Sequence, residues 1–226
     1  DDFIARTNSD LINNVVNLCS RVTKFIAKRF GGAVRPVDAS HPLVEQLTET
    51  MDAVRGSYEA WDFRAAMRHL AIAGDAVNQY FQSAEPWKQV NADPEGAHDV
   101  CSMALYGATV LMTLLSPIVP GTAARFAEAL GAEALTWSHL DPASLPSTVG
   151  APKTLLERLD ASVVDRIIED AKADAAAAEP DAGASPDDLV DVDDFAPEIT
   201  FDDFAKIDLR VGVVESASFV EGASKL

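Results

Sequence analysis

Three polar side chains at helical spacing, Asn13, Asn17 and Arg21, are the residues of this chain best suited to chemistry. Positions i, i+4 and i+8 of a helix lie near one face, so these two amides and one guanidinium form a row of hydrogen-bond donors and acceptors. Such a row can pair with the edge of an unpaired base, while Lys24 and Lys28 further along can contact backbone phosphates. The residues therefore predict selective binding of single-stranded nucleic acid.

The asparagines also have a simpler interpretation. Asparagine is less favourable in a helix than alanine by about 0.5 kcal/mol or more, yet Asn13, Asn14 and Asn17 all fall inside one predicted helix. A binding role would account for them. The alternative, which spacing alone favours, is an ordinary solvated face with one or two hydrogen bonds to a neighbouring helix.

The stretch from Leu11 to Val37 is basic in an acidic protein of 226 residues and net charge −18. Thirteen acidic residues against one basic residue lie between Glu169 and Asp203, so that segment carries −12 and the rest of the chain only −6. Total charge therefore says little about what the helical part binds. We predict phosphate contacts for Lys24, Lys28 and Arg29, and the five basic residues of the stretch are Arg21, Lys24, Lys28, Arg29 and Arg35.

Trp87 is the aromatic residue most suited to contact a base. It follows Pro86 at the end of a predicted helix, where a large ring would be only partly buried. A partly exposed ring near cations can stack on a base, and the alternative is a tryptophan that closes the core. Trp61 and Trp137 have no basic neighbours in the sequence, and we assign both to packing.

Nothing in the sequence predicts catalysis or metal binding by this chain. There is no glycine-rich phosphate loop, and the histidines have no carboxylate or thiol partners at useful spacing. Cys19 and Cys101 lie in apolar surroundings without metal-ligand spacing and are predicted to be buried free thiols. We therefore predict no catalytic residue, no metal and no cofactor here, and assign to the surface or to partly buried positions His41, His69, His98 and His139.

Hydrophobic residues recur at helical spacing through the first 170 or so residues. At about 100° per residue, one side of the first helix buries Leu11, Val15, Leu18, Val22 and Ile26. Glycines at 31 and 32 end that helix. A later helix has a buried stripe of Phe63, Met67, Leu70, Ala73, Val77 and Phe81. The predicted helices are 11–30, 43–58, 63–84, 97–115, 122–130 and 153–178.

The fold predicted is an all-α antiparallel helical bundle at residues 1–172, with short loops. Residues 173–197, rich in alanine, aspartate and proline, are predicted to be an acidic linker, because they cannot bury enough apolar surface to fold. In residues 198–226, apolar and polar residues alternate with a period of two, as they do in a strand. We predict that this segment is the truncated start of a second domain, because a lone strand has no sheet to complete it. No membrane span or secretion signal is evident, and we expect a cytoplasmic protein.

Several blocks of the sequence resemble the anticodon-binding helical domain of bacterial methionyl-tRNA synthetases. The resemblance covers nearly the whole chain in order, and its last block is similar to the start of that family's appended tRNA-binding OB domain. The blocks are Asn13-x-x-x-Asn17-Leu18-Cys19-Ser20-Arg21, Phe25-Ile26-x-Lys28-Arg29-Phe30, Ala84-Glu85-Pro86-Trp87, Leu135-Thr136-Trp137, Leu156-Glu157-Arg158-Leu159-Asp160 and Ile199-Thr200-Phe201-Asp202-Asp203-Phe204-Ala205-Lys206-Ile207-Asp208-Leu209-Arg210-Val211.

The resemblance implies roles for individual residues. Asn17 and Arg21 would read the wobble cytosine of a CAU anticodon, Trp87 would stack on that base, and Asn13 and Asp75 would support them. The partner implied is tRNA(Met). The family's catalytic portion, with its ATP-binding signatures and any zinc knuckle, would precede this chain, and the complete OB domain would add tRNA affinity and form a homodimer. The chain would thus be an inactive C-terminal part of a methionine–tRNA ligase.

Two other functions remain open from the residues. A helical protein-interaction module could use the acidic linker to attract basic partners. The anticodon domain of another class I aminoacyl-tRNA synthetase would share the bundle and prefer a different anticodon. The block from Asn17 to Arg21, together with Pro86 and Trp87, argues against that last alternative.

Overall fold

The computed structural model describes residues 2–177 together with Thr200, Phe204 and Lys206. The chain divides into two units after Glu169, and the first unit holds the helices that matter here. The predicted linker beyond residue 177 and the predicted strand at 208–214 lie outside the described residues.

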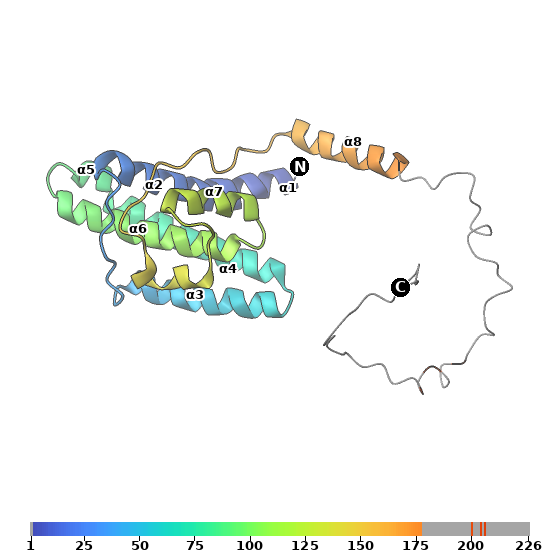
Figure 1. Ribbon diagram of the computed structural model, residues 1–226, viewed down its shortest axis with the longest axis horizontal. Helices are drawn as coiled ribbons and strands as arrows, with labels where there is room; N and C mark the ends of the chain where they lie inside the picture. The colour runs from blue at the N-terminus through green and yellow to red at the C-terminus, as the bar shows by residue number, and fades with distance from the viewer. Residues whose placement is uncertain (1, 178–199, 201–203, 205, 207–226) are drawn as a thin grey trace, which may run out of the picture. The chain divides into compact units, whose positions relative to one another are not determined.

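The described part is helical, as predicted, and it contains no strand. Its one pairing of extended backbone is an isolated antiparallel bridge between Ala33 and Thr148. The elements, shown in Figure 1, are α1 (Asp2–Arg6), the π-helix η1 (Thr7–Val16), α2 (Asn17–Arg29), α3 (Pro42–Glu59), α4 (Phe63–Ala84), α5 (Pro86–Gln89), α6 (Pro94–Leu115), α7 (Pro120–Leu130), the 3-10 helices η2 (Trp137–Leu140) and η3 (Pro142–Ser144), and α8 (Ala161–Ala177).

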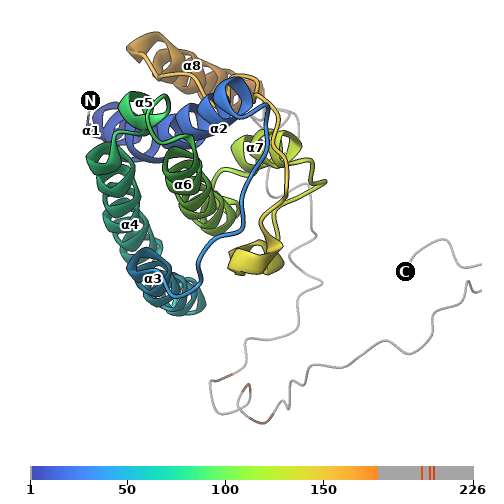
Figure 2. The ribbon, with the colours of Figure 1, turned by 90° about the vertical axis from the view of Figure 1, so that its left-hand side faces the viewer.

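Helix α6 forms the centre of the bundle. Every residue from Cys101 to Leu115 is buried, and Figure 2 shows α6 enclosed by α2, α3, α4 and α7. The helix is long and apolar enough to cross a membrane by composition, but 83% of its most apolar window is buried inside the protein. Its apolar character is therefore explained by burial on all sides. The fully buried Tyr106 donates a hydrogen bond to the Leu140 carbonyl at 2.8 Å.

The first helical stretch is continuous from α1 through η1 to α2, and its middle is a π-helix. The Asn17 N–H bonds to the Ile12 carbonyl five residues back, and the α-helical pattern begins there. The predicted buried side is confirmed, but the wider π turn also buries Ile12 and Val16. The polar side is confirmed too, because the exposed residues include Asn13, Asn17, Arg21, Lys24, Lys28 and Arg29.

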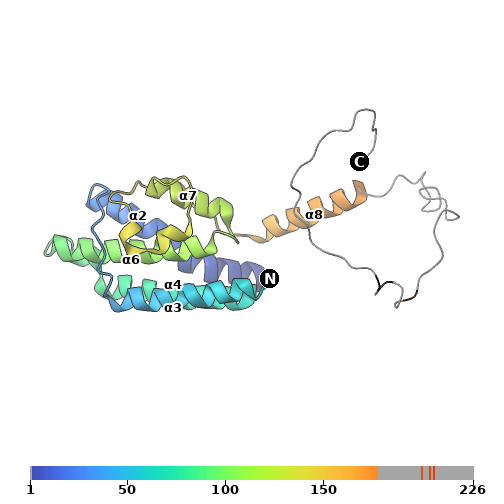
Figure 3. The ribbon, with the colours of Figure 1, turned by 60° about the horizontal axis from the view of Figure 1, so that its bottom comes forward.

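The helices α2, α3, α4, α6 and α7 alternate in direction along the chain, as the predicted antiparallel bundle requires (Figure 1), and Figure 3 shows α3 and α4 side by side. Helices η1–α2 and α4 lie next to one another but run in the same direction. Asn14 hydrogen-bonds to the Ala71 carbonyl, and Arg21, further along, hydrogen-bonds to Asn78. This parallel pair is what places the polar side of α2 beside α4.

Four predicted helix boundaries are wrong. The first helical stretch begins at Asp2, with α1 and η1, instead of at residue 11. Helices α6 and α7 begin at Pro94 and Pro120, a turn or less before their predicted starts, because proline fits the first turn of a helix, where its missing N–H is not needed. The last helix begins at Ala161 instead of residue 153. The Asp160 carboxylate accepts a hydrogen bond from the Val163 N–H at 3.3 Å, as a helix N-cap does.

Residues 151–160 run as an irregular strap across the bundle, held by side chains from distant elements. Arg125 Nε donates to the Leu155 carbonyl at 2.7 Å, and the Leu155 side chain is buried. The Asn8 amide forms two bonds with Leu159, donating to its carbonyl at 2.8 Å and accepting from its N–H at 3.0 Å. These bonds replace the helical bonds that the strap lacks.

The packing roles predicted for three aromatic residues are wrong. Trp61 is 80% exposed, Trp137 is 50% exposed, and Phe63 at the start of the α4 stripe is 48% exposed. Trp61 ends the α3–α4 turn with φ of 58° and contacts Phe63 only by an edge, at 6.1 Å between centroids. Trp137 has a cationic neighbour after all, since the Arg55 guanidinium lies 5.2 Å from its ring centroid. A turn at the end of two helices has no layer above it to cover such rings.

Candidate nucleic-acid interface

The predicted polar row lies on the exposed side of η1 and α2. Asn17 Nδ2 donates to Asn13 Oδ1 at 3.3 Å, so the two amides are linked one turn apart. Both side chains are exposed, as is Arg21 a further turn along. The structure therefore presents the three residues in the order and on the side that their spacing predicts.

Arg21 is held in place by α4. Its Nη2 donates to Asn78 Oδ1 at 3.2 Å, and its guanidinium carbon lies 5.2 Å from the centroid of the Phe81 ring. Partial burial lowers the pKa of Arg21 from its ordinary value, but an arginine remains charged at physiological pH. The remaining N–H groups of the guanidinium are available to a ligand.

Trp87 reaches the same ring from another element. Glu85 adopts a left-handed conformation with φ of 42°, which ends α4, and the buried Pro86 starts the short helix α5. The turn brings the indole edge-on against Phe81, with centroids 5.7 Å apart and planes at 70°. Trp87 is 40% exposed. Part of its surface is thus packed and part is available for stacking.

Asp75 acts through Asn14 in this structure. Asn14 Nδ2 donates to Asp75 Oδ1 at 2.9 Å and to the Ala71 carbonyl at 3.1 Å. Asn78 Nδ2 donates to both the backbone and side-chain oxygens of Asn14, each at 2.8 Å. Gly74 permits this close approach, since a Cβ there would lie 2.9 Å from Asn14 Oδ1. The interhelical alternative thus explains Asn14.

The exposed cations of α2 are free to contact phosphate. Within residues 2–177, Lys24, Lys28 and Arg29 make no ion pair, and all three are exposed. Arg35, by contrast, pairs with Asp99 at 2.9 Å. The charge needed to attract a polyanion is therefore concentrated beside the polar row.

The titratable residues outside this surface have structural roles. His41 caps α3, and His98 stacks on Phe30 with ring centroids 4.1 Å apart. All four histidines are half-buried, as predicted. Both cysteines are buried free thiols, as predicted, and burial raises the pKa of Cys19 and raises that of Cys101 to about 12. In the described part of the chain, no group of three histidines, cysteines or carboxylates could hold a metal ion.

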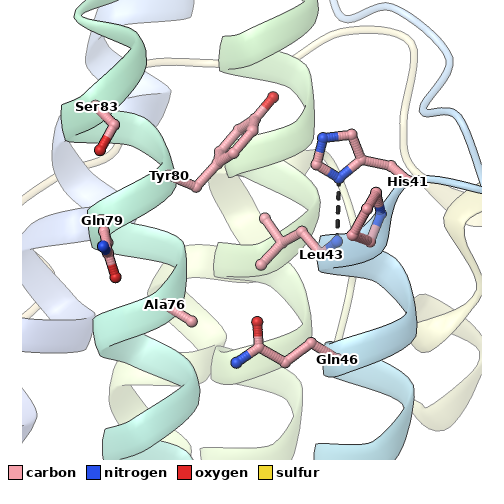
Figure 4. A pocket seen from close by; sticks show the side chains of 8 residues that line it. His41, Leu43, Gln46, Ala76, Gln79, Tyr80 and Ser83 are labelled. Atoms are coloured by element: carbon pink, nitrogen blue, oxygen red, sulfur yellow. Dashed lines mark hydrogen bonds between the residues drawn. The ribbon is translucent and has the colours of Figure 1, made fainter.

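A shallow cavity of about 330 Å³ lies between α3 and α4 (Figure 4). Figure 4 shows His41 Nδ1 accepting a hydrogen bond from the Leu43 N–H, at 3.1 Å, at its rim. The cavity faces Tyr80, which is one residue from Phe81 and so about 100° around the helix. It contains no lysine, arginine or carboxylate, and its lining is His41, Pro42, Leu43, Gln46, Ala76, Gln79, Tyr80 and Ser83. It therefore lacks the charge found around Arg21, and its aromatic pair, His41 and Tyr80 with ring centroids 5.2 Å apart, has no arginine in the lining beside it.

Phe81 and Asn78 are the residues around this surface to which the sequence assigned no binding role. Phe81 was predicted only as part of a buried stripe, and it is indeed fully buried. Nothing local distinguishes it from the other stripe residues. Asn78 carries a weak signal, since a polar residue at helical spacing from Asp75 extends a polar face.

The surface can be compared with known proteins. The family model described as the anticodon binding domain of methionyl tRNA ligase matches residues 31–176. That match includes Asp75 and Trp87 and begins after α2. Among solved structures, the apo form of Mycobacterium tuberculosis methionyl-tRNA synthetase has a TM-score of 0.59 at 21% identity, covering 70% of this chain and 34% of that one. At that identity, the similarity shows a shared fold.

Curated relatives match the whole chain. The methionine–tRNA ligase of Cupriavidus pinatubonensis is 39% identical over 229 residues, covering 100% of this chain and 33% of the relative. That of Neisseria meningitidis serogroup C is 38% identical, covering 100% of this chain and 32% of the relative. The chain thus spans about a third of the length of these relatives. The family model matches more than half of the chain, and the chain belongs to the family of anticodon-binding domains of methionyl tRNA ligases.

Proposed function

We propose that this chain recognises the CAU anticodon of tRNA(Met), with Asn17 and Arg21 reading the wobble cytosine and Trp87 stacking on it. The observation that carries the proposal is the convergence of Arg21 and Trp87 on one ring, that of Phe81. The family match supports this function over a protein-interaction module or another synthetase's anticodon domain.

The chemistry of the site suits cytosine. The base-pairing edge of cytosine has two acceptors, O2 and N3, and one donor, the N4 amino group. Arg21 can donate to the acceptors with the N–H groups that Asn78 does not use, and the Asn17 carbonyl can accept from the amino group. Uracil has a donor at N3 and an acceptor at O4, so it would leave these groups unpaired, at about 1 to 3 kcal/mol each.

The surrounding residues support the readers in this proposal. Asn13 accepts a hydrogen bond from Asn17 Nδ2, so the carbonyl oxygen of the Asn17 amide is the group left for the base. Asp75 anchors Asn14 and so keeps the π-helix against α4. Lys24, Lys28 and Arg29 contact backbone phosphates, which supply affinity without base selectivity.

The direct test changes the RNA. The 226-residue chain is titrated with an anticodon hairpin bearing CAU and with the same hairpin bearing UAU. We expect about 10- to 100-fold weaker binding of UAU, since a mismatched base leaves buried polar groups unpaired. A hairpin with an altered stem sequence and an unchanged loop serves as the control and should bind like the original. Equal affinity for all three RNAs would mean that the surface binds polyanions without selecting the base.

A second prediction concerns the indole. Trp87→Ala should weaken binding of the CAU hairpin by about 1 to 3 kcal/mol, the usual contribution of one stacked base. Trp61→Ala is a matched control, because Trp61 is 80% exposed at the α3–α4 turn and far along α4 from Phe81. Fluorescence anisotropy of a labelled hairpin measures both. If the two variants lose affinity equally, Trp87 does not stack on the RNA.

The activity of the longer protein is also a proposal. The relatives are methionine–tRNA ligases about three times as long, and one solved relative is a methionyl-tRNA synthetase bound by methionyl-adenylate. We propose that the parent protein attaches methionine to its tRNA in the cytoplasm, using ATP at a catalytic portion outside this chain, with any zinc knuckle there. Residues 1–172 would be the anticodon domain, 173–197 the linker, and 198–226 the start of an OB domain that forms a homodimer when complete.

A further inference from the structure

The Phe81 ring is contacted from two directions by the two side chains proposed to hold the base. The Arg21 guanidinium lies over the ring, and the Trp87 indole meets it at 70°. Phe81 itself is fully buried. It therefore cannot touch an RNA ligand, and any effect it has on binding must pass through Arg21 and Trp87.

We propose that Phe81 is a positioning residue for anticodon recognition, and that its aromatic ring sets the geometry of both Arg21 and Trp87 before RNA arrives. This inference rests on the proposed function. It assigns a specific role to a residue of the buried stripe that would otherwise count only as core.

The chemistry requires a ring at this position. An aromatic face carries negative potential that attracts a guanidinium, and its positive edge favours the tilted contact made by an indole. An aliphatic side chain of similar size would fill the space and offer neither interaction. Phe81 thus restricts two side chains that would otherwise sample many orientations on an open surface.

Arg21 gains most from this restriction. Arginine has a long flexible side chain, and a ligand that had to immobilise it would bind less tightly. Arg21 Nη2 donates a hydrogen bond to Asn78 Oδ1 at 3.2 Å, and the central carbon of the guanidinium lies 5.2 Å from the centroid of the Phe81 ring. Two contacts from α4 therefore fix the direction of the N–H groups that remain for cytosine.

The first experiment compares two buried phenylalanines in the 226-residue chain. Phe81→Leu should lower affinity for the CAU hairpin about tenfold, the loss expected for one cation–π and one aromatic pair. Phe126→Leu is the control, since Phe126 on α7 is equally buried and, in the described part, has no arginine over its face and no aromatic ring against it. Both variants should lose thermal stability, but only the first should lose affinity beyond twofold. Equal losses of affinity would overturn the proposal.

A double-mutant cycle tests whether Phe81 acts through Arg21. In an Arg21→Ala background, Phe81→Leu should cost less than threefold in affinity, because the cation that it positions is gone. A full tenfold cost in that background would mean that Phe81 does not act through Arg21. If Phe81→Leu fails to fold, Phe81→Met replaces it, because the flexible methionine side chain fills irregular space in a core.

An RNA-free measurement separates this inference from the proposed function. In the NMR spectrum, the Arg21 side-chain resonances should show a ring-current shift that is lost in Phe81→Leu and kept in Phe126→Leu. If that shift is present but the chain does not discriminate CAU from UAU, the function is wrong while the positioning stands. If the shift is absent from the unmodified chain, Phe81 does not position Arg21.

Discussion

Replacing Arg21 with alanine is expected to weaken binding of a CAU anticodon hairpin by about 2 to 3 kcal/mol, which is about 30- to 150-fold. The guanidinium donates charge-assisted hydrogen bonds in a partly desolvated position, between Asn78 and the Phe81 ring, where water cannot replace them well. Removing it also leaves Asn78 Oδ1 without its Arg21 partner. Calorimetric titration of the 226-residue chain measures the loss.

The matched control is Arg68→Ala. Arg68 is an exposed arginine on α4, so this variant changes the net charge equally at a position outside the polar row. It should lose less than threefold in affinity at 150 mM salt, since one remote charge contributes only to general attraction. A UAU hairpin is the RNA control, and Arg21→Ala should discriminate CAU from UAU less than the unmodified chain does, with only the contribution of Asn17 remaining. Discrimination as large as that of the unmodified chain would show that Arg21 is not a reader.

Replacing Gly107 with valine is expected to destabilise the bundle by about 3 kcal/mol. Gly107 lies in the central helix α6, and a Cβ at that position would be 2.8 Å from both methyl carbons of Val77 on α4. Val77 is fully buried and β-branched, so it cannot rotate away. The two helices would have to separate, and Asn78 and Phe81 on α4, which contact Arg21, would move with them. Urea denaturation followed by circular dichroism measures the change.

Gly56→Ala is the control for that variant, with an effect of opposite sign. Gly56 lies inside α3, is exposed, and has no atom within 4 Å of an added Cβ. Alanine there should stabilise the protein by about 0.5 to 1 kcal/mol, because it restricts the unfolded chain and favours a helix. If Gly107→Val were tolerated like Gly56→Ala, the close approach of α4 and α6 would be wrong.

Much of the fold could be predicted from local pattern. Apolar spacing identified the helices of the bundle and the buried side of α2, because burial on one face of a helix requires a period near 3.6. The predicted starts of the helices were less accurate, since α6, α7 and α8 begin at Pro94, Pro120 and Ala161. A proline in a sequence predicts the end of a helix, yet proline is also common at the first position of a helix.

The sequence by itself determined that Asn13, Asn17 and Arg21 share an exposed side and that Trp87 follows a helix end, since helical spacing and proline are local constraints. Only the tertiary structure decided that α2 and α4 lie parallel, with Phe81 between Arg21 and Trp87. Contacts between residues sixty positions apart depend on how whole helices pack. A periodic pattern specifies which face of a helix is buried, but not which neighbour covers that face.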